Sequence, residues 1–257
     1  MGYSINFDKT STIYDTSRYA IPEKVEKLIS CLSLSSDSVV LDLGCGTGNF
    51  AEALNPRVKT IVGIDISSGM LRKAITKSKG FRLVRGNVEC LPFESGTFDC
   101  AFAVQVLHHV EQKELFLEEV YRALKQGGSF ALDTCSHKQM KTFWFYHYFP
   151  EALEQDLSRI PDCYKIVSLL EKAGFNNLRV EISYSDIASE HLKPENYLNK
   201  DYRDGMSTFQ LLDEHAVEHG CAVLKEDIMS GEVTHIIGKF AKEEAIVGGS
   251  SIVFGKT

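Results

Sequence analysis

The sequence predicts an α/β protein built on a doubly wound, mostly parallel seven-stranded sheet. Apolar, β-branched segments alternate with segments of helical periodicity from residue 39 to residue 134. Residues 97–106 form a nearly continuous apolar run, which is typical of a parallel strand covered on both faces. Because parallel strands need crossover connections, usually helices, this alternation indicates successive β-α-β units.

Residues 39–134 supply five of the predicted strands. Pro22 opens a helix with one apolar face, and proline is well tolerated in a first turn. Ser67 is a suitable N-cap for a later helix, and Gly127-Gly128 is expected to end another. The predicted strands are 39–43, 60–66, 81–86, 97–106 and 129–134, and the crossover helices are 49–54, 67–77 and 114–125.

The regular order changes after residue 134. Residues 143–150 contain six aromatic side chains and a histidine. The later predicted elements are a helix over 162–173, a strand over 177–184, helices over 208–229 and 232–245, and a last strand over 250–255. We therefore expect one domain over 1–257, with an N-terminal cap segment at 1–20 and a helical insertion or lid at 186–247.

Composition and charge disfavour several classes of function. The formal net charge of −7 argues against a nucleic-acid partner, because phosphate binding normally requires a basic face. The seven cysteines include no CxxC pair and no zinc-like spacing, so we expect reduced thiols and no metal. No basic-then-apolar leader and no apolar run near 18 residues is present, which predicts a cytoplasmic protein without a membrane segment. We expect a monomer or homodimer.

A glycine turn and two carboxylates indicate the kind of ligand. Gly44-x-Gly46-x-Gly48 departs from the dinucleotide fingerprint G-x-G-x-x-G at residue 49, which is asparagine. Asp42 would repel a pyrophosphate and favour a cationic group. Asp65 ends the second strand, where it can accept hydrogen bonds from ribose hydroxyls. These residues favour a nucleoside with a positively charged tail; the alternatives are a turn without ligand and a surface or N-capping Asp65.

Five motifs resemble those of class I S-adenosylmethionine-dependent methyltransferases. In order they are Leu41–Gly48, Gly63–Leu71, Gly86–Phe93 with Phe98-Asp99, Leu107–Val110 and Arg122–Gly128. The branch that the chain most resembles is the ubiquinone-biosynthesis-like group, which acts on small molecules. The resemblance implies a Rossmann-like methyltransferase fold, S-adenosylmethionine as methyl donor, S-adenosylhomocysteine as product and a small-molecule acceptor.

The resemblance also implies a set of cofactor-binding residues. They are Asp42, Gly44 and Gly46 for the methionine moiety, Asp65 for the ribose, Ile66, Met70, Asn87 and Val88 for adenine, and Gln105 beside the sulfonium. The family often has aspartate where Asn87 stands; asparagine can both donate and accept, so the adenine contact is kept.

Methyl transfer is an in-line displacement at a carbon activated by positively charged sulfur. The protein must supply proximity, alignment and, for some acceptors, a base. His108, just past the fourth strand, is the candidate catalytic base. The alternative is that His108 only shapes the pocket while His109 packs structurally.

The acceptor side is less constrained by the sequence. Arg18 could pair with the cofactor carboxylate, with Tyr19 in the substrate pocket, unless both belong to a surface helix start. Trp144, His147 and Tyr148 are the polar-tipped candidates for facing the acceptor, and core packing is the alternative. An RNA or protein methyltransferase, or a non-catalytic S-adenosylmethionine-binding module, remains open, because the motifs report cofactor binding only.

Overall fold

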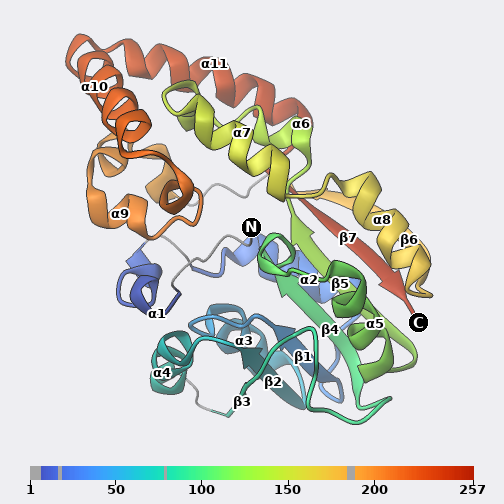
Figure 1. Cartoon of the computed structure of the whole chain (residues 1–257). Helices are drawn as coiled ribbons and strands as arrows, with labels where there is room; N and C mark the ends of the chain where they lie inside the picture. Colours follow the sequence, from blue (N-terminus) through green and yellow to red (C-terminus); the bar gives the residue numbers. More distant parts are fainter. Residues whose placement is uncertain (1–6, 17–18, 78–79, 184–188) are drawn as a thin grey trace.

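The computed structural model describes residues 7–16, 19–77, 80–183 and 189–257 (Figure 1). Its sheet has the strand order β3-β2-β1-β4-β5-β7-β6. The strands are β1 (Val39–Leu43), β2 (Thr60–Asp65), β3 (Arg82–Arg85), β4 (Phe98–Val104), β5 (Leu124–Thr134), β6 (Asn176–Ser183) and β7 (Ser250–Lys256). Pairs from β3 to β5 are parallel, whereas β7 runs antiparallel between β5 and β6. The predicted mostly parallel seven-stranded sheet is confirmed; the direction of β7 was not predicted.

The helices of the described residues connect these strands and cover them. The α-helices are α1 (Phe7–Thr10), α2 (Pro22–Leu32), α3 (Asn49–Leu54), α4 (Ser68–Lys77), α5 (Lys113–Ala123), α6 (His137–Met140), α7 (Pro150–Arg159), α8 (Cys163–Lys172), α9 (Lys200–Asp204), α10 (Glu214–Ser230) and α11 (Glu232–Val247). The 3₁₀ helices are η1 (Tyr14–Thr16), η2 (Asn55–Arg57), η3 (Leu107–His109), η4 (Trp144–His147), η5 (Ser189–Leu192), η6 (Pro194–Leu198) and η7 (Phe209–Leu211).

Helices cover both faces of the sheet. Successive strand residues point to opposite faces. Leu41 of β1 shares a buried cluster with Phe116 of α5 and Ile166 of α8. Val40 shares the cluster on the other face with Leu28 of α2 and Leu54 of α3. With both faces covered, the carboxyl ends of the strands are left for a ligand, as in other doubly wound sheets.

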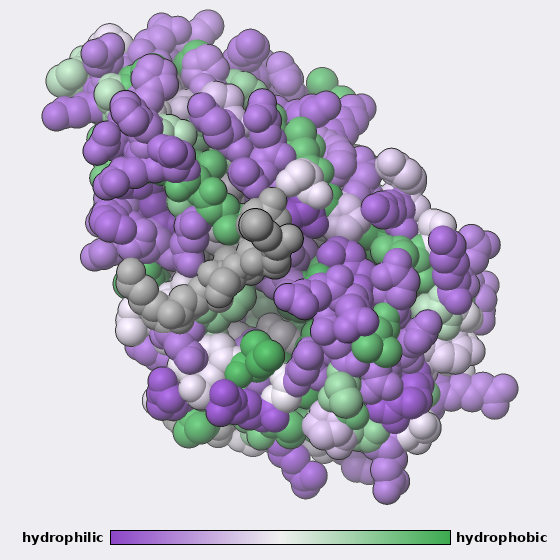
Figure 2. Space-filling view, viewed as in Figure 1, coloured by the Kyte–Doolittle hydropathy of each residue, from purple (hydrophilic) through white to green (hydrophobic). Residues whose placement is uncertain are grey.

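A second body of helices lies above those carboxyl ends in Figure 1. We call residues 137–160 and 194–247, which hold α6, η4, α7, η6, α9, η7, α10 and α11, the helical lid. It has its own buried cluster, which includes Trp144, Phe149, Tyr197 and Leu224. Figure 2 shows that the visible outer surface of this part is mostly hydrophilic. Most side chains of the aromatic segment are buried in this cluster, and the segment between β6 and β7 holds α9, α10 and α11.

Two predicted helix boundaries are wrong. Gly127-Gly128 does not end α5, because the chain is already extended at Leu124 and the glycines lie within β5. The β4–β5 register shifts there, since Phe98 pairs with Leu124 but Cys100 with Ser129. The helix predicted from residue 208 begins at Glu214, where Asp213 accepts a hydrogen bond from the His215 N–H as its N-cap.

Candidate functional site

A cavity of about 640 Å³ is lined both by the carboxyl ends of the strands and by the helical lid. Small-molecule sites typically enclose about 300–1,000 Å³. Asp42 of β1, Asp65 of β2 and Gln105 after β4 line one part, and Trp144 of η4 lines another. The cavity is therefore the candidate active site.

The glycine turn is fixed by backbone hydrogen bonds to β2. The Gly44 N–H donates to the Ile64 carbonyl at 2.8 Å and the Gly46 N–H to Asp65 Oδ2 at 2.8 Å. Gly44 has φ of 68°, and a Cβ there would lie 2.6 Å from Val106 Cγ2. Glycine is required by both conformation and space, so the turn brings bare backbone to the cavity.

Asp65 holds the turn while lining the cavity. Its Oδ1 accepts from the Ser67 N–H at 2.8 Å and its Oδ2 from Gly46. Burial raises the pKa of Asp65, and these backbone N–H groups oppose the rise. Each carboxylate oxygen has a second lone pair, which can accept from a ribose hydroxyl. Ser67 Oγ accepts from the Met70 N–H at 3.1 Å, which confirms Ser67 as the N-cap of α4.

Asp42 provides a test of whether the site fits a cationic ligand. It is 3% exposed, and its Oδ2 has no hydrogen-bond partner among the described residues. Burial, followed by the charge of Asp65, raises the pKa of Asp42 well above its ordinary value. A buried carboxyl oxygen without a partner is stabilised by a positive group beside it. The ammonium group of S-adenosylmethionine meets this requirement, so the residues fit the cofactor.

The four residues predicted for adenine all line the cavity. Ile66 is 61% exposed, which leaves a face of its side chain available to a ring. Met70 is almost fully buried beside it. Asn87 Oδ1 accepts from the Glu89 N–H at 2.9 Å, and Val88 lies between these two in the chain. The structure thus brings Ile66, Met70, Asn87 and Val88 to one cavity.

Gln105 is held in an unusual backbone conformation at the end of β4. Its φ is 55°, which side-chain-bearing residues rarely adopt. The Gln105 Nε2 donates to Asp133 Oδ1 at 2.9 Å, and its N–H donates to the Asp133 carbonyl at 3.2 Å. These bonds orient the Gln105 side chain along the cavity wall.

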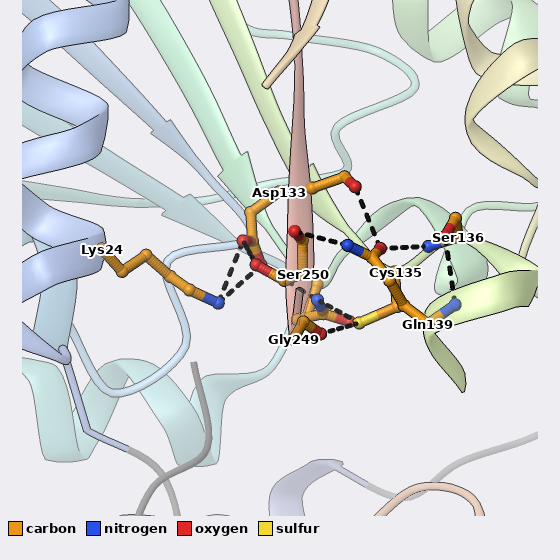
Figure 3. Close-up of polar contacts among 9 residues, drawn as sticks. Lys24, Asp133, Cys135, Ser136, Gln139, Gly249 and Ser250 are labelled. Carbon is orange, nitrogen blue, oxygen red and sulfur yellow. Dashed lines mark hydrogen bonds and ion pairs between the residues drawn. The ribbon is translucent and has the colours of Figure 1, made fainter. Parts of the chain in front are cut away.

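A buried ion pair that sequence reasoning missed lies beside Gln105, and its lysine, Lys24, lines the cavity. Figure 3 shows Lys24 and Asp133 pointing toward each other, with Nζ 3.0 Å from Oδ2. Ser250 Oγ donates to the same oxygen at 3.2 Å, and Gln139 Nε2 donates to the Ser250 carbonyl at 2.8 Å. The network joins α2, β5, β7 and α6. The sequence feature that could have revealed the pair is the position of Lys24. It lies four residues before Leu28 and therefore on the apolar face of α2.

The N-terminal residues contact the cofactor side of the cavity. Asp15 Oδ1 accepts from Thr47 Oγ1 at 2.5 Å, and Asp15 forms an ion pair with Lys77 at 2.8 Å. Asp8 Oδ1 accepts from the Gly69 N–H at 2.6 Å. Tyr19 is exposed and lines the cavity, whereas the prediction for Arg18 falls outside the described residues.

His108 and His109 both line the cavity from η3. Their ring centroids lie 3.9 Å apart, and the His109 ring meets that of Phe7 edge-on at 4.8 Å. His109 thus packs against α1, as the structural alternative proposed. His108 lies at the cavity wall.

Two of the three aromatic-segment candidates do not reach the cavity, which corrects the prediction. Trp144 lines it, but His147 and Tyr148 are turned toward the outer helices. The Tyr148 hydroxyl donates to Asp227 Oδ2 of α10 at 2.9 Å, and the exposed His147 ring lies 6.2 Å from that of Phe240 in α11. The presence of a polar group on the ring did not identify the residues that face the cavity. The polar groups of Tyr148 and His147 instead face α10 and α11, which supply Asp227 and Phe240 as partners.

Other lid residues that line the cavity were not among the named candidates. They include apolar side chains and a polar cluster at the end of α7 and just before η7: Phe143, Phe145, Tyr146, Asp156, Arg159, Met206 and Thr208. Among the described residues, no group of three or more histidine, cysteine, aspartate or glutamate side chains is arranged to hold a metal ion. Within the same part of the chain, no helix is both long enough and apolar enough to span a membrane.

Comparison with known sequences places the family match on the part of the chain that contains the glycine turn and Asp65. Residues 41–132 match a family model described as a methyltransferase domain. The demethylmenaquinone methyltransferase of Staphylococcus carnosus is 27% identical over 214 residues, which cover 74% of this chain and 88% of the relative. The Staphylococcus aureus enzyme of the same name is 28% identical over 227 residues, covering 79% of this chain and 92% of that one.

Solved structures share the fold. A protein of Anabaena variabilis, assigned as a methyltransferase of an antibiotic biosynthesis pathway, has a TM-score of 0.77 at 24% identity and covers 91% of this chain and 96% of its own. Phosphoethanolamine N-methyltransferase 2 of Haemonchus contortus, solved with S-adenosyl-L-methionine, has a TM-score of 0.62 at 18% identity. The match covers 97% of this chain and 57% of that one. The family model over residues 41–132, the curated relatives and the shared fold together support a class I S-adenosylmethionine-dependent methyltransferase.

Proposed function

We propose that the protein transfers the methyl group of S-adenosylmethionine to a small, largely apolar acceptor beneath the helical lid. The observation that carries the proposal is the continuity of one cavity. Asp42 and Gly46 line it at the glycine turn, and Trp144 and Phe145 line it in the lid. An acceptor against the lid residues would lie next to a cofactor at the turn, and enclosure would keep water from the reaction.

Two observations support a menaquinone-type acceptor as the substrate class. The relatives from Staphylococcus are demethylmenaquinone methyltransferases. The lid part of the cavity is rich in aromatic side chains, including Phe143, Trp144 and Phe145, which suit a flat ring system. By contrast, no observation favours RNA or protein as acceptor, and the net charge of −7 argues against RNA.

The chain's own residues position the reactants in this proposal. When bound, S-adenosylmethionine supplies a methyl group made electrophilic by its positively charged sulfur. Asp42 and the backbone of Gly44 and Gly46 would hold the methionine moiety, and Asp65 would hold the ribose hydroxyls. The adenine would be held by Ile66, Met70, Asn87 and Val88, and Gln105 would be the residue beside the sulfonium. Tyr19 and Trp144 contact the acceptor, and His108 accepts a proton from it. Transfer is an in-line displacement, so alignment by these groups is their main contribution.

Transfer of labelled methyl from S-adenosylmethionine into a small-molecule extract tests the proposal. The wild-type protein is expected to label an organic-soluble compound. The His108→Gln variant should keep its cofactor affinity and lose roughly 10²–10⁴-fold in the rate of transfer, because general bases contribute about that much. Cofactor binding without transfer to any small molecule would contradict the proposal. Equal rates for wild type and variant would remove His108 from the chemistry.

A further inference from the structure

We propose that Arg159 binds an oxygen atom of the methyl acceptor and so selects acceptors with a carbonyl or anionic oxygen on a flat apolar body. The inference rests on the proposed function, which places the acceptor under the lid. Arg159 is the last residue of α7, it lines the cavity, and its side chain is 5% exposed.

One edge of the Arg159 guanidinium is engaged and the other is not. Nε donates to Asp156 Oδ1 at 2.7 Å, and Nη2 donates to Ser207 Oγ at 2.9 Å and to Thr208 Oγ1 at 3.1 Å. Nη1 is buried and has no hydrogen-bond partner among the described residues. A buried donor without a partner is destabilising, and more so when the group is charged. An acceptor oxygen brought against Arg159 would satisfy Nη1.

Asp156 fixes the guanidinium and balances its charge. Its Oδ2 accepts from the Tyr146 hydroxyl at 2.6 Å and from Thr208 Oγ1 at 2.7 Å, while Oδ1 faces Arg159. Burial and the Asp156 charge raise the pKa of Tyr146, which keeps this hydroxyl protonated as a donor. Because the pair is neutral as a whole, Nη1 offers donors without excess positive charge. This suits one carbonyl or phenolate-like oxygen better than a phosphate dianion.

The walls beside Arg159 define the rest of the ligand. Met140, Phe145, Ile160 and Met206 line the same cavity and are all buried. Two methionines and an aromatic ring form an adaptable apolar surface. A polar contact at one edge of such a surface fixes the orientation of a bound molecule, and an analogue without the oxygen leaves the donor unpaired.

Three ring compounds of similar size test the proposal by equilibrium dialysis against the full chain. They are 1-tetralone with a carbonyl oxygen, tetralin with none, and 1-naphthoate with an anionic one. Wild-type protein is expected to bind at least one oxygen-bearing probe roughly tenfold or more tightly than tetralin, as a satisfied polar contact predicts. A tighter fit for 1-tetralone identifies a neutral oxygen, and one for 1-naphthoate identifies an anion.

Conservative variants separate this contact from folding. Arg159→Lys keeps a cation beside Asp156 but has no second nitrogen for the ligand, so the preference over tetralin should fall to within twofold; Arg159→Met should abolish it. Arg203→Lys, in α9 and outside the cavity lining, should keep the full preference.

Titration calorimetry of each protein with S-adenosylmethionine shows whether the protein is folded and its cofactor site intact, independently of the three ring compounds. Absence of cofactor binding by the wild type would refute the proposed function. Normal cofactor binding with equal affinity for all three probes, or with the preference intact in Arg159→Lys, would overturn the role of Arg159.

Discussion

Asp42 combines burial, an unsatisfied oxygen and a raised pKa at the cavity wall. Because its folded pKa lies above the unfolded one, the native state holds the proton more tightly. The stability contributed by this group is therefore present at low pH and lost as the pH rises through the raised pKa. A cation beside Asp42 favours its ionised form, so cofactor affinity should rise with pH over the same window.

Replacing Asp42 by asparagine keeps the shape and removes the charge. The cofactor-free Asp42→Asn variant should be more stable than wild type at mildly alkaline pH, by roughly 0.5–2 kcal/mol, as is common when a strained functional group is relieved. Its affinity for S-adenosylmethionine should fall at least tenfold and lose its rise with pH, as a buried charge contact predicts. Urea unfolding and calorimetry measure both, with the exposed change Asp37→Asn as control. The same pH dependence in wild type and Asp42→Asn would contradict the assignment.

The turn between β1 and α3 is the element on which the cofactor half depends. Gly44 and Gly96 have nearly equal φ, 68° and 66°, but a Cβ on Gly44 meets Val106 whereas one on Gly96 meets nothing within 4 Å. Gly96→Ala should thus cost about 1–2 kcal/mol from backbone conformation alone. Gly44→Ala should cost a further 1–3 kcal/mol, roughly, from overpacking.

Thermal unfolding of the two variants measures this difference, and cofactor titration measures its consequence. Gly44→Ala is expected to bind S-adenosylmethionine much more weakly than Gly96→Ala does. Equal stabilities and equal affinities in the two variants would show that the turn tolerates a side chain.

Strands and helices were predictable where local pattern and burial agree. Val39–Leu43 and Asn49–Leu54 match the prediction residue for residue, since an apolar run, a glycine turn and a helical pattern follow one another. The end of α5 was not predictable from Gly127-Gly128, because β5 pairing with β4 recruits Leu124 into the sheet earlier. Tertiary pairing overrode the local signal there.

The assembled molecule brings together residues that no local pattern connects. Lys24 and Asp133 are 109 positions apart, yet they form the buried ion pair beside Gln105. Gln210 Nε2 of the lid donates to Thr10 Oγ1 of α1 at 2.9 Å, and α1 in turn contacts α4 through Asp8. The cofactor residues were predictable because a contiguous motif carries them. Arg159 and its partners were not, because they converge only when the lid folds.

Isothermal titration with S-adenosylmethionine tests the central claim, that the glycine turn and the ends of β1 and β2 hold this cofactor. Asp65→Ala removes the proposed ribose contact, and Asp99→Ala is a matched control. Asp99 also accepts from a backbone N–H, that of Val39, but does not line the cavity. Wild type and Asp99→Ala are expected to bind alike, and Asp65→Ala at least tenfold more weakly, as loss of hydrogen bonds to a charged group predicts. No binding by the wild type at millimolar cofactor, or unchanged affinity in Asp65→Ala, would contradict the account.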